Sequence, residues 1–574
     1  MDLCGETMVY FNYIAMGLIC VFILIAALVK KRRPLSERFD RLIESRRFEI
    51  VFIAVLLIVG AALRLIGLSE LPAGMNQDEA SIGYDSWAIA NYGVDRNGYH
   101  NPVYPVAWGA GHGPFYMYAA SLFIKLFGNS LFVYRLPQAL LGVLSVFVLY
   151  LLLKKTTDRF TAYIGALLLC VSPWHIISSR WGLDANPAPF LILFGLYFFV
   201  KGCQDKKTWS YALSAALFSL SLYTYASTYI VVPIMLIILV VYALVRRYLT
   251  VKQLVISGVV CIVIAVPLAM FWVVNLFKLP EIHTALFSVP RLTALRSNSV
   301  FLPFDQEFFG NVLKNIGSLF SLLFSYPVRE LHNIIDGFNI IYVFTFPLFL
   351  LGGFLSFKRA IKLKSDRFDF AMCAWFVAAF IFSLIVRQNI NRINVLFIPV
   401  IYFVAVGIRF LADRQRELCA VVLCLIMAGS GLFVKSYFGP EYRQQIGAQF
   451  MHGFGEAAQY ADSLDRNTVY CADLYTDGRV NGGYLLLMYY CKVDPTRFNS
   501  TVQYYNNDAE FRFAKSFDRY NFVLPQDMTA DEYQDDVFIL PSDYANRFDL
   551  RYDIKQFDNF IVVSRSRSTI WQSR

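Results

Sequence analysis

Charged residues are scarce in this chain. Asp, Glu, Lys and Arg together make up 16% of its 574 residues, whereas an ordinary soluble domain carries about a quarter. Hydrophobic residues make up 57%. Many separate apolar runs reach the length of about 17 to 25 residues that a helix needs to cross a bilayer. We therefore exclude an ordinary soluble fold and predict a polytopic α-helical membrane protein.

Several sequence motifs are also missing. The chain has no CxxC pair, no Cys/His spacing typical of a metal site and no glycine-rich phosphate loop. Its ten cysteines are scattered, mostly within apolar runs, where they behave as small apolar residues. Cys471 and Cys491 are the exception, because they lie in a more polar C-terminal region. If that region is extracytoplasmic they could form a disulfide, and two unpaired core thiols are the alternative.

The charge that is present is distributed as in a membrane protein. The net charge of +10 does not indicate a nucleic-acid partner, because much of the excess lies in short loops between apolar runs. The first apolar run, 9–29, is long enough to span a bilayer and has no basic leader, so we expect a retained helix and not a cleaved signal peptide. From Glu441 onward acidic residues outnumber basic ones, which is typical of a soluble domain.

The basic loops orient the predicted spans. The segment 30–47 is strongly basic and is therefore expected in the cytoplasm, which puts the N-terminus outside. A single alternating assignment then places the basic clusters between spans inside, apart from arginines in a few outer turns. The apolar, aromatic stretch 114–127 is short for a span and is expected to lie at the membrane interface. The twelve predicted transmembrane helices are 9–29, 48–68, 131–153, 160–178, 187–200, 209–226, 229–245, 254–276, 340–357, 368–386, 393–410 and 418–434.

Three parts follow from this topology. Residues 1–47 form an extra transmembrane helix with a basic cytoplasmic loop. Residues 48–438 form the main transmembrane domain, with long extracytoplasmic loops at 69–129 and 278–336. Residues 439–574 alternate short strand-like and helix-like runs and are predicted to form a small extracytoplasmic α/β domain. Both termini are therefore expected outside the cytoplasm.

Four groups of polar residues lie on the predicted outer face. Carboxylates can act as general bases toward a hydroxyl group, and arginines bind phosphate through two parallel hydrogen bonds. Acids and arginines together beside lipid suit a reaction between a lipid phosphate and a polar acceptor. The groups are Asn76-Gln77-Asp78-Glu79, the stretch HGPFYMY that begins at His112, SRWGLDANP with Arg180 and Asp184, and RQNINR with Arg387 and Arg392.

The order of these groups resembles the GT-C membrane glycosyltransferases, in particular the dolichyl-phosphate-mannose protein mannosyltransferase-like and aminoarabinose transferase-like families. Those families carry an acidic motif, often Asp-Glu, in the first outer loop, as at Asp78-Glu79. A proline–aromatic stretch follows, here GPFYMYAASLFIKLFG, and then Arg-Leu-Pro at the start of a span, here Arg135 to Pro137. Ser-Pro near a helix end is next, followed by Arg and Asp, as in SPWHIISSRWGLD. The resemblance covers roughly residues 48 to 200.

The resemblance implies a mechanism and a set of site residues. A sugar on a polyprenyl-phosphate carrier would be transferred to an extracytoplasmic hydroxyl of a cell-surface glycan, lipid or protein. Asp78 would be the general base, Glu79 would orient it or bind a metal, and Asp184 would help position the acceptor. The implied partners are the lipid-linked donor, the acceptor and the bilayer. The residues expected to stabilise the departing lipid phosphate are Arg180, Arg387, Arg392 and, in support, His112.

Departures from the family pattern keep other functions open. The chain has an extra N-terminal span, it has Gly113-Pro114 in place of the usual double proline, and its C-terminal region is unlike the β-trefoil of eukaryotic protein mannosyltransferases. No cofactor is certain, although some relatives depend on a divalent metal. A glycolipid flippase or transporter is one alternative. A polysaccharide polymerase or ligase that uses undecaprenyl-diphosphate donors is another.

Overall fold

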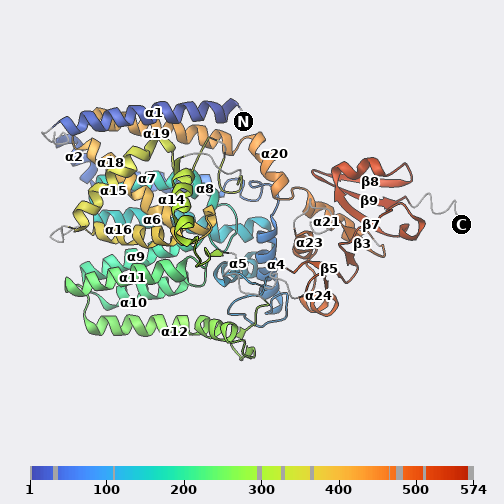
Figure 1. Ribbon diagram of the computed structural model, residues 1–574. Coiled ribbons are helices and arrows are strands. Elements are labelled where there is room, and N and C mark those ends of the chain that lie inside the picture. Colours follow the sequence, from blue (N-terminus) through green and yellow to red (C-terminus); the bar gives the residue numbers. More distant parts are fainter. Residues whose placement is uncertain are drawn as a thin grey trace. The chain divides into compact units, whose positions relative to one another are not determined.

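The computed structural model is mostly helical, and its C-terminal part carries a small mixed sheet (Figure 1). Its contacts divide the chain into two compact units, each assembled from separate stretches of sequence. The first unit contains residues 1–66, 138–266 and 297–442; the second contains residues 67–137, 267–296 and 443–574. The structure describes residues 3–29, 37–107, 110–293, 300–324, 330–335, 337–361, 368–464, 466–473, 482–507 and 512–566.

The first unit is built from apolar helices. In the described residues, eight helices of the chain are long and apolar enough to cross a membrane. They confirm a multi-pass helical protein, while the number of twelve spans stays a prediction. The helices that lie wholly or largely in this unit are α1 (Leu3–Leu28), α2 (Glu37–Glu44), α3 (Arg46–Leu65), α6 (Leu131–Thr156), α7 (Arg159–Cys170), α8 (Pro173–Ser178), α9 (Ala188–Asp205), α10 (Thr208–Ser221), α11 (Thr228–Val245), α12 (Val251–Leu276), α14 (Phe308–Phe324), α15 (Phe346–Ile361), α16 (Asp369–Ile385), α17 (Ile390–Ile393), α18 (Phe397–Ala412) and α19 (Arg416–Tyr437).

One predicted span is divided in two. The stretch 160–178 was expected to be a single helix, but α7 ends at Cys170 and α8 begins at Pro173. Proline cannot donate a backbone hydrogen bond, so it begins a new helix more readily than it continues one. The Ser172 side chain caps the new helix by accepting from the His175 N–H at 3.5 Å. The break shortens the second piece to six residues and leads the chain directly to Arg180.

The second unit combines helices with a seven-stranded sheet. The strand order is β4-β5-β6-β3-β7-β9-β8, in which β3 runs parallel to both β6 and β7 and the other pairs are antiparallel. The small sheet predicted for the C-terminal region is thereby confirmed. Its strands are β3 (Val469–Cys471), β4 (Gln503–Tyr504), β5 (Ala514–Phe517), β6 (Tyr520–Asn521), β7 (Val537–Pro541), β8 (Tyr552–Phe557) and β9 (Phe560–Arg565), and its helices include α4 (Gln77–Tyr92), α5 (Pro114–Phe127), α20 (Pro440–Gln449), α21 (Phe454–Ser463), α23 (Gly483–Cys491) and α24 (Pro495–Thr501).

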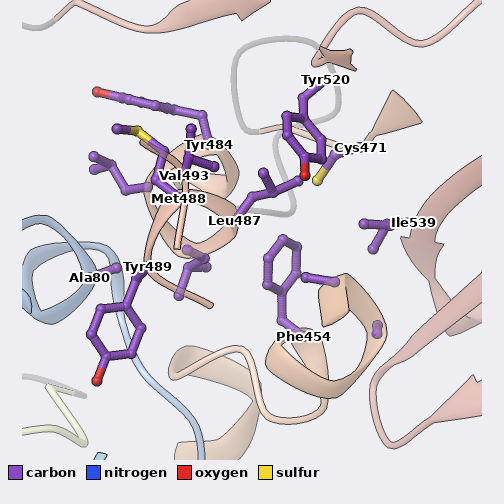
Figure 2. Packing of buried hydrophobic residues seen from close by; sticks show 14 of the residues in the cluster. Ala80, Phe454, Cys471, Tyr484, Leu487, Met488, Tyr489, Val493, Tyr520 and Ile539 are labelled. Carbon is purple, nitrogen blue, oxygen red and sulfur yellow. The ribbon is translucent and has the colours of Figure 1, made fainter. Parts of the chain in front are cut away.

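The core of the second unit joins residues of the 69–129 segment to the C-terminal sheet. Buried side chains of α4, α5, α21, α23 and the sheet form one hydrophobic cluster. Figure 2 shows Ala80 of α4 beside Tyr489 of α23. Helix α4 approaches α23 closely at Gly83, where a Cβ would lie 3.0 Å from the Tyr489 ring. The helix that carries Asp78 and Glu79 is therefore anchored by apolar packing against α23. Cys471 and Cys491 both have free thiols.

Candidate functional site

Asp78 and Glu79 lie in the first turn of α4. The helix begins after Asn76, whose side chain accepts from the Glu79 N–H at 2.9 Å. Asn is among the residues preferred at this position because its side-chain oxygen satisfies a free backbone donor. The N-terminus of a helix favours acidic residues, and both carboxylates lie in that first turn. Their surroundings then differ sharply: Glu79 is fully buried, while Asp78 is only partly buried.

Glu79 forms a buried ion pair with Arg135, the arginine of the Arg-Leu-Pro motif at the start of α6. Arg135 Nε donates to Glu79 Oε1 at 3.0 Å, and Nη2 donates to Oε2 at 2.7 Å. Both side chains are 0% exposed. The same guanidinium donates to the carbonyl oxygens of Leu68, Pro72 and Gly74. Glu79 and Arg135 therefore hold the segment before α4 against the start of α6.

A second buried charged cluster lies about two turns further along α4. Arg96 donates from Nε to Asp85 Oδ1 at 3.0 Å and from Nη2 to Oδ2 at 2.7 Å. His112 Nε2 lies 3.6 Å from Asp85 Oδ2, and His112 Nδ1 lies 3.2 Å from the Gly113 carbonyl oxygen. Burial raises the pKa of Asp85, but the charge and hydrogen bonds of Arg96, together with the nearby His112 ring, outweigh it and keep that pKa below its usual range. The predicted site residue His112 is thus held beside a charged aspartate.

Asp95 is the other carboxylate of this region. Its Oδ1 accepts from the backbone N–H groups of Asn97 and Tyr99, each at 2.9 Å. Its Oδ2 is buried without a hydrogen-bond partner. Burial, and next the negative charge of Asp85, raise the pKa of Asp95 to about 8. Asp95 is therefore largely protonated at neutral pH, while Asp85 carries the charge.

Arg180 is in the first unit and is fully buried. It donates from Nη1 to the Leu63 carbonyl at 3.0 Å and from Nη2 to the Ile66 carbonyl at 2.8 Å. These carbonyls end α3, where no helical donor is available to them. The guanidinium also lies 5.0 Å from the Phe438 ring centroid. Arg180 thus caps a helix end, and its expected contact with a lipid phosphate stays a prediction.

The third and fourth predicted groups come together within the first unit. Asp184 lies, 7% exposed, in the turn between α8 and α9. Asn394, which follows the RQNINR stretch, donates from Nδ2 to the Ala185 carbonyl at 2.8 Å. Within that stretch Arg392 Nη1 donates to the Arg387 carbonyl at 2.9 Å, and the Arg387 side chain is exposed. The turn with Asp184 is therefore held against the segment with the two late arginines.

The described residues do not assemble a metal site. No group of three or more His, Cys, Asp or Glu side chains that could hold an ion occurs among them. Glu79, the residue with a metal-binding role among those expected, already has both carboxylate oxygens on Arg135. A cation next to this guanidinium would be repelled, so Glu79 does not fit the metal-binding role.

Four ionisable residues of this region were not predicted as site residues from the sequence: Arg135, Asp85, Asp95 and Arg96. Arg135 had a signal, because it belongs to the Arg-Leu-Pro motif, but its partner Glu79 lies 56 positions earlier. Asp85 also had one, since residues i and i+7 share a helix face, which puts it on the side of Asp78. No pattern in the sequence marks Asp95 or Arg96.

Three solved structures are similar to this chain, and the first of them has a comparable fold. ArnT from Cupriavidus metallidurans bound to undecaprenyl phosphate is 15% identical, with a TM-score of 0.51 over 91% of this chain and 99% of that chain. The Archaeoglobus fulgidus oligosaccharyltransferase in complex with Zn and sulfate is 16% identical, with a TM-score of 0.46 over 76% and 61%. Arabinosyltransferase EmbB from Mycobacterium smegmatis is 13% identical, with a TM-score of 0.32 over 73% and 44%.

The fold is that of the GT-C class of membrane glycosyltransferases. Residues 111–272 match the family model described as dolichyl-phosphate-mannose-protein mannosyltransferase, over a stretch that runs from just before α5 into α12. No curated protein matches the sequence. The partial family match and the shared fold confirm the resemblance predicted from the sequence, and they support a glycosyltransferase as the class of enzyme.

Proposed function

We propose that this protein transfers a sugar from a polyprenyl-phosphate carrier to an extracytoplasmic hydroxyl acceptor, with Asp78 as the general base. The observation that carries the proposal is the different environment of two adjacent carboxylates. Glu79 is buried and bound by Arg135 through both oxygens, whereas Asp78 is partly exposed at the helix N-terminus. A general base must be ionised and within reach of its substrate, and of the two residues Asp78 has the exposure that this role needs.

The proposed reaction is a single displacement. Asp78 accepts the proton of the acceptor hydroxyl, and the oxygen of that hydroxyl attacks the anomeric carbon of the donor sugar. The bond from that carbon to the phosphate oxygen breaks with inversion, and the polyprenyl phosphate leaves with the electron pair. Cationic side chains that stabilise the departing phosphate lower the barrier. We assign this role to Arg387 and Arg392, with Arg180 and His112 in support, and a positioning role for the acceptor to Asp184.

A monophosphate carrier is the donor class that we favour. The description of the family model that matches residues 111–272 names a dolichyl-phosphate sugar. The crystal structure of ArnT contains undecaprenyl phosphate. We also propose that residues 48–438 form the catalytic transmembrane domain and that residues 439–574 lie outside the cytoplasm. On this view the same outer face carries the carboxylates and the late arginines.

Reconstituted vesicles provide the test. The purified chain is supplied with radiolabelled sugar on either a polyprenyl monophosphate or a polyprenyl diphosphate, together with membrane glycan acceptors. We expect transfer from the monophosphate donor and its loss in Asp78→Ala. Transfer from the diphosphate donor alone would identify a polymerase or ligase. Movement of the lipid-linked sugar across the bilayer without transfer, and retained in Asp78→Ala, would identify a flippase and overturn the proposal.

A further inference from the structure

Arg64 is a buried charge that the proposed reaction does not use. It lies in α3, one of the helices long and apolar enough to cross a membrane, and it is 0% exposed. It lies in the last turn of this helix, where a charge buried away from water is costly unless its donors are satisfied. Arg64 Nη1 donates to the Gly60 carbonyl of its own helix at 3.1 Å. Its other printed hydrogen bonds go to residues on either side of the break between α7 and α8.

Arg64 closes the end of α7. Its Nη2 donates to the Cys170 carbonyl at 3.1 Å and to the Leu169 carbonyl at 3.4 Å. The proline at position 173 cannot donate to Leu169, so this carbonyl accepts from the Ser172 N–H at 3.4 Å and from Arg64 instead. Helix α6 makes room for this arrangement at Gly142, where a Cβ would lie 2.2 Å from Ser179 Oγ and 3.2 Å from Arg64 Cδ.

The same guanidinium fixes the state of His175. Arg64 Nη2 lies 2.6 Å from His175 Nδ1. A guanidinium can only donate, so Nδ1 must accept, and the ring proton of the neutral imidazole is on Nε2. The ring is held further by the Phe190 ring, whose centroid lies 5.0 Å from its own. Arg64 therefore holds one particular tautomer and orientation of a side chain in the middle of α8.

Arg180 completes a reciprocal arrangement. Arg64 of α3 binds the carbonyls at the end of α7, and Arg180, which follows α8, binds the Leu63 and Ile66 carbonyls at the end of α3. Between the end of α7 and Arg180 the chain has only the break, the six residues of α8 and Ser179. The chain after Arg180 enters the turn that carries Asp184. A shift of the α7–α8 break would therefore move Arg180 and Asp184 together.

We infer that Arg64, acting with His175, is a positioning residue that sets the place of the Asp184 turn for sugar transfer. This inference rests on the proposed function, in which Asp184 positions the acceptor. It assigns a functional reason to a buried charge in the last turn of an apolar helix. A displacement of about 1 Å at a reacting group can lower a rate about 100-fold, even when the mutated residue is remote.

The kinetic test uses full-length protein in lipid nanodiscs, with rates expressed per folded molecule. In Arg64→Lys we expect kcat to fall about 100-fold while KM for the donor stays within threefold. His175→Asn, which keeps an acceptor near the Nδ1 position, should retain most of the rate that His175→Leu loses. The matched control is Arg359→Lys, because Arg359 also lies in an apolar helix and pairs with a buried carboxylate, Asp369, at 2.9 Å. Its kcat should stay within threefold of the wild type.

A double-mutant cycle separates positioning from general stability. If Arg64 acts through the turn, Arg64→Lys should cause no further loss in an Asp184→Asn background. Losses that multiply, or a wild-type kcat in Arg64→Lys, would overturn the inference. Absence of transfer by the wild-type protein would instead overturn the proposed function.

If the wild-type protein shows no transfer, the effect of Arg64 on the Asp184 turn can still be measured by chemical labelling. A cysteine introduced as Asp184→Cys should react with a maleimide faster when Arg64→Lys is present than when Arg359→Lys is present, with the parent chain as background. Equal labelling rates in these two backgrounds would contradict the positioning role.

Discussion

At the scale of single residues, two adjacent carboxylates lie in different environments. Glu79 is a structural partner, since it neutralises a buried arginine that also binds three backbone carbonyls. Asp78 is partly exposed and starts the same helix. Substitutions at the two positions should therefore fail in different ways, one in folding and the other in chemistry.

Glu79→Gln is expected to destabilise the protein. It leaves the Arg135 guanidinium buried without a counter-charge, and breaking a buried pair in this way costs about 3 to 5 kcal/mol. Thermal unfolding in detergent, followed by the yield of monodisperse protein, measures the effect. Asp78→Asn is the matched neighbour and should melt close to the wild type. Equal melting temperatures for Glu79→Gln and the wild type would show that the ion pair has no structural role.

Asp95 predicts a pH dependence of stability. Its pKa in the folded chain is raised to about 8 by burial and by the charge of Asp85. Because the folded state holds a proton that the unfolded state has already released, stability falls as the pH rises from about 4 to about 8. Asp95→Asn keeps the Oδ1 acceptor and removes the ionisation, so between pH 6 and pH 8 it should lose about 2 kcal/mol less stability than the wild type. Melting curves at pH 6 and pH 8 test this. An equal loss of stability between these two pH values in the variant and the wild type would contradict it.

At the scale of elements, the close packing of α15 on α18 depends on two glycines. A Cβ at Gly352 would lie 1.8 Å from the Phe403 carbonyl oxygen, and one at Gly407 would lie 2.3 Å from the Leu348 carbonyl oxygen. Small residues let membrane helices approach through their backbones. This contact holds α18, which continues the chain from the RQNINR segment and Asn394.

Gly352→Ala should separate these helices and lower stability by about 1 to 3 kcal/mol. Gly353→Ala is a control one residue away, where the nearest atom to a new Cβ is a ring carbon of Phe403 at 3.8 Å. Thermal unfolding of both variants in the same detergent compares them. A Gly353→Ala variant that is as unstable as Gly352→Ala would contradict the role of the close approach.

The sequence predicted many elements well and others poorly, for physical reasons. The helix Pro114–Phe127 was predicted with its observed bounds, because a glycine precedes its N-terminal proline and another follows its last residue. Helix α11 was predicted to within one residue, since basic residues follow its apolar run. The α7–α8 break was missed, because Ser172 and Pro173 lie inside a continuous apolar stretch whose length alone favoured one span.

The candidate site was predicted by motif and not by contact. Asp78, Glu79, His112 and the arginines follow an order along the chain that resembles a family. Only tertiary packing shows that Arg135 neutralises Glu79, or that Arg180 binds the carbonyls at the end of α3. Hydrophobic periodicity determines which faces are buried, but it carries no information on which buried charges meet.

At the scale of the whole molecule, the confirmed class is a multi-pass membrane protein with the GT-C fold. The sidedness follows from the basic loops and stays a prediction. It places Lys207, in the loop between α9 and α10, in the cytoplasm, and Gln526, in the C-terminal sheet region, outside. Both side chains are exposed, so cysteines at these positions can be labelled without disturbing a core.

Membrane-impermeant maleimide labelling of intact cells tests this orientation. Gln526→Cys should react at once, whereas Lys207→Cys should react only after permeabilisation. The parent chain without added cysteine corrects for its native thiols. The opposite pattern would place the C-terminal domain in the cytoplasm and would contradict an extracytoplasmic acceptor.

The central claim is that Asp78 is the base of a sugar transfer, and a single-turnover rate measures it most directly. Purified wild-type or Asp78→Asn protein, in molar excess over a polyprenyl-phosphate sugar, is mixed with that donor and the acceptor. The release of the lipid phosphate is followed over time. Glu456→Gln is the control, because Glu456 is an exposed acid in the first turn of another helix, α21, of the same unit. The account predicts a loss of about 100-fold or more in Asp78→Asn with unchanged melting, and a wild-type rate in the control. An Asp78→Asn rate within threefold of the wild type would contradict it.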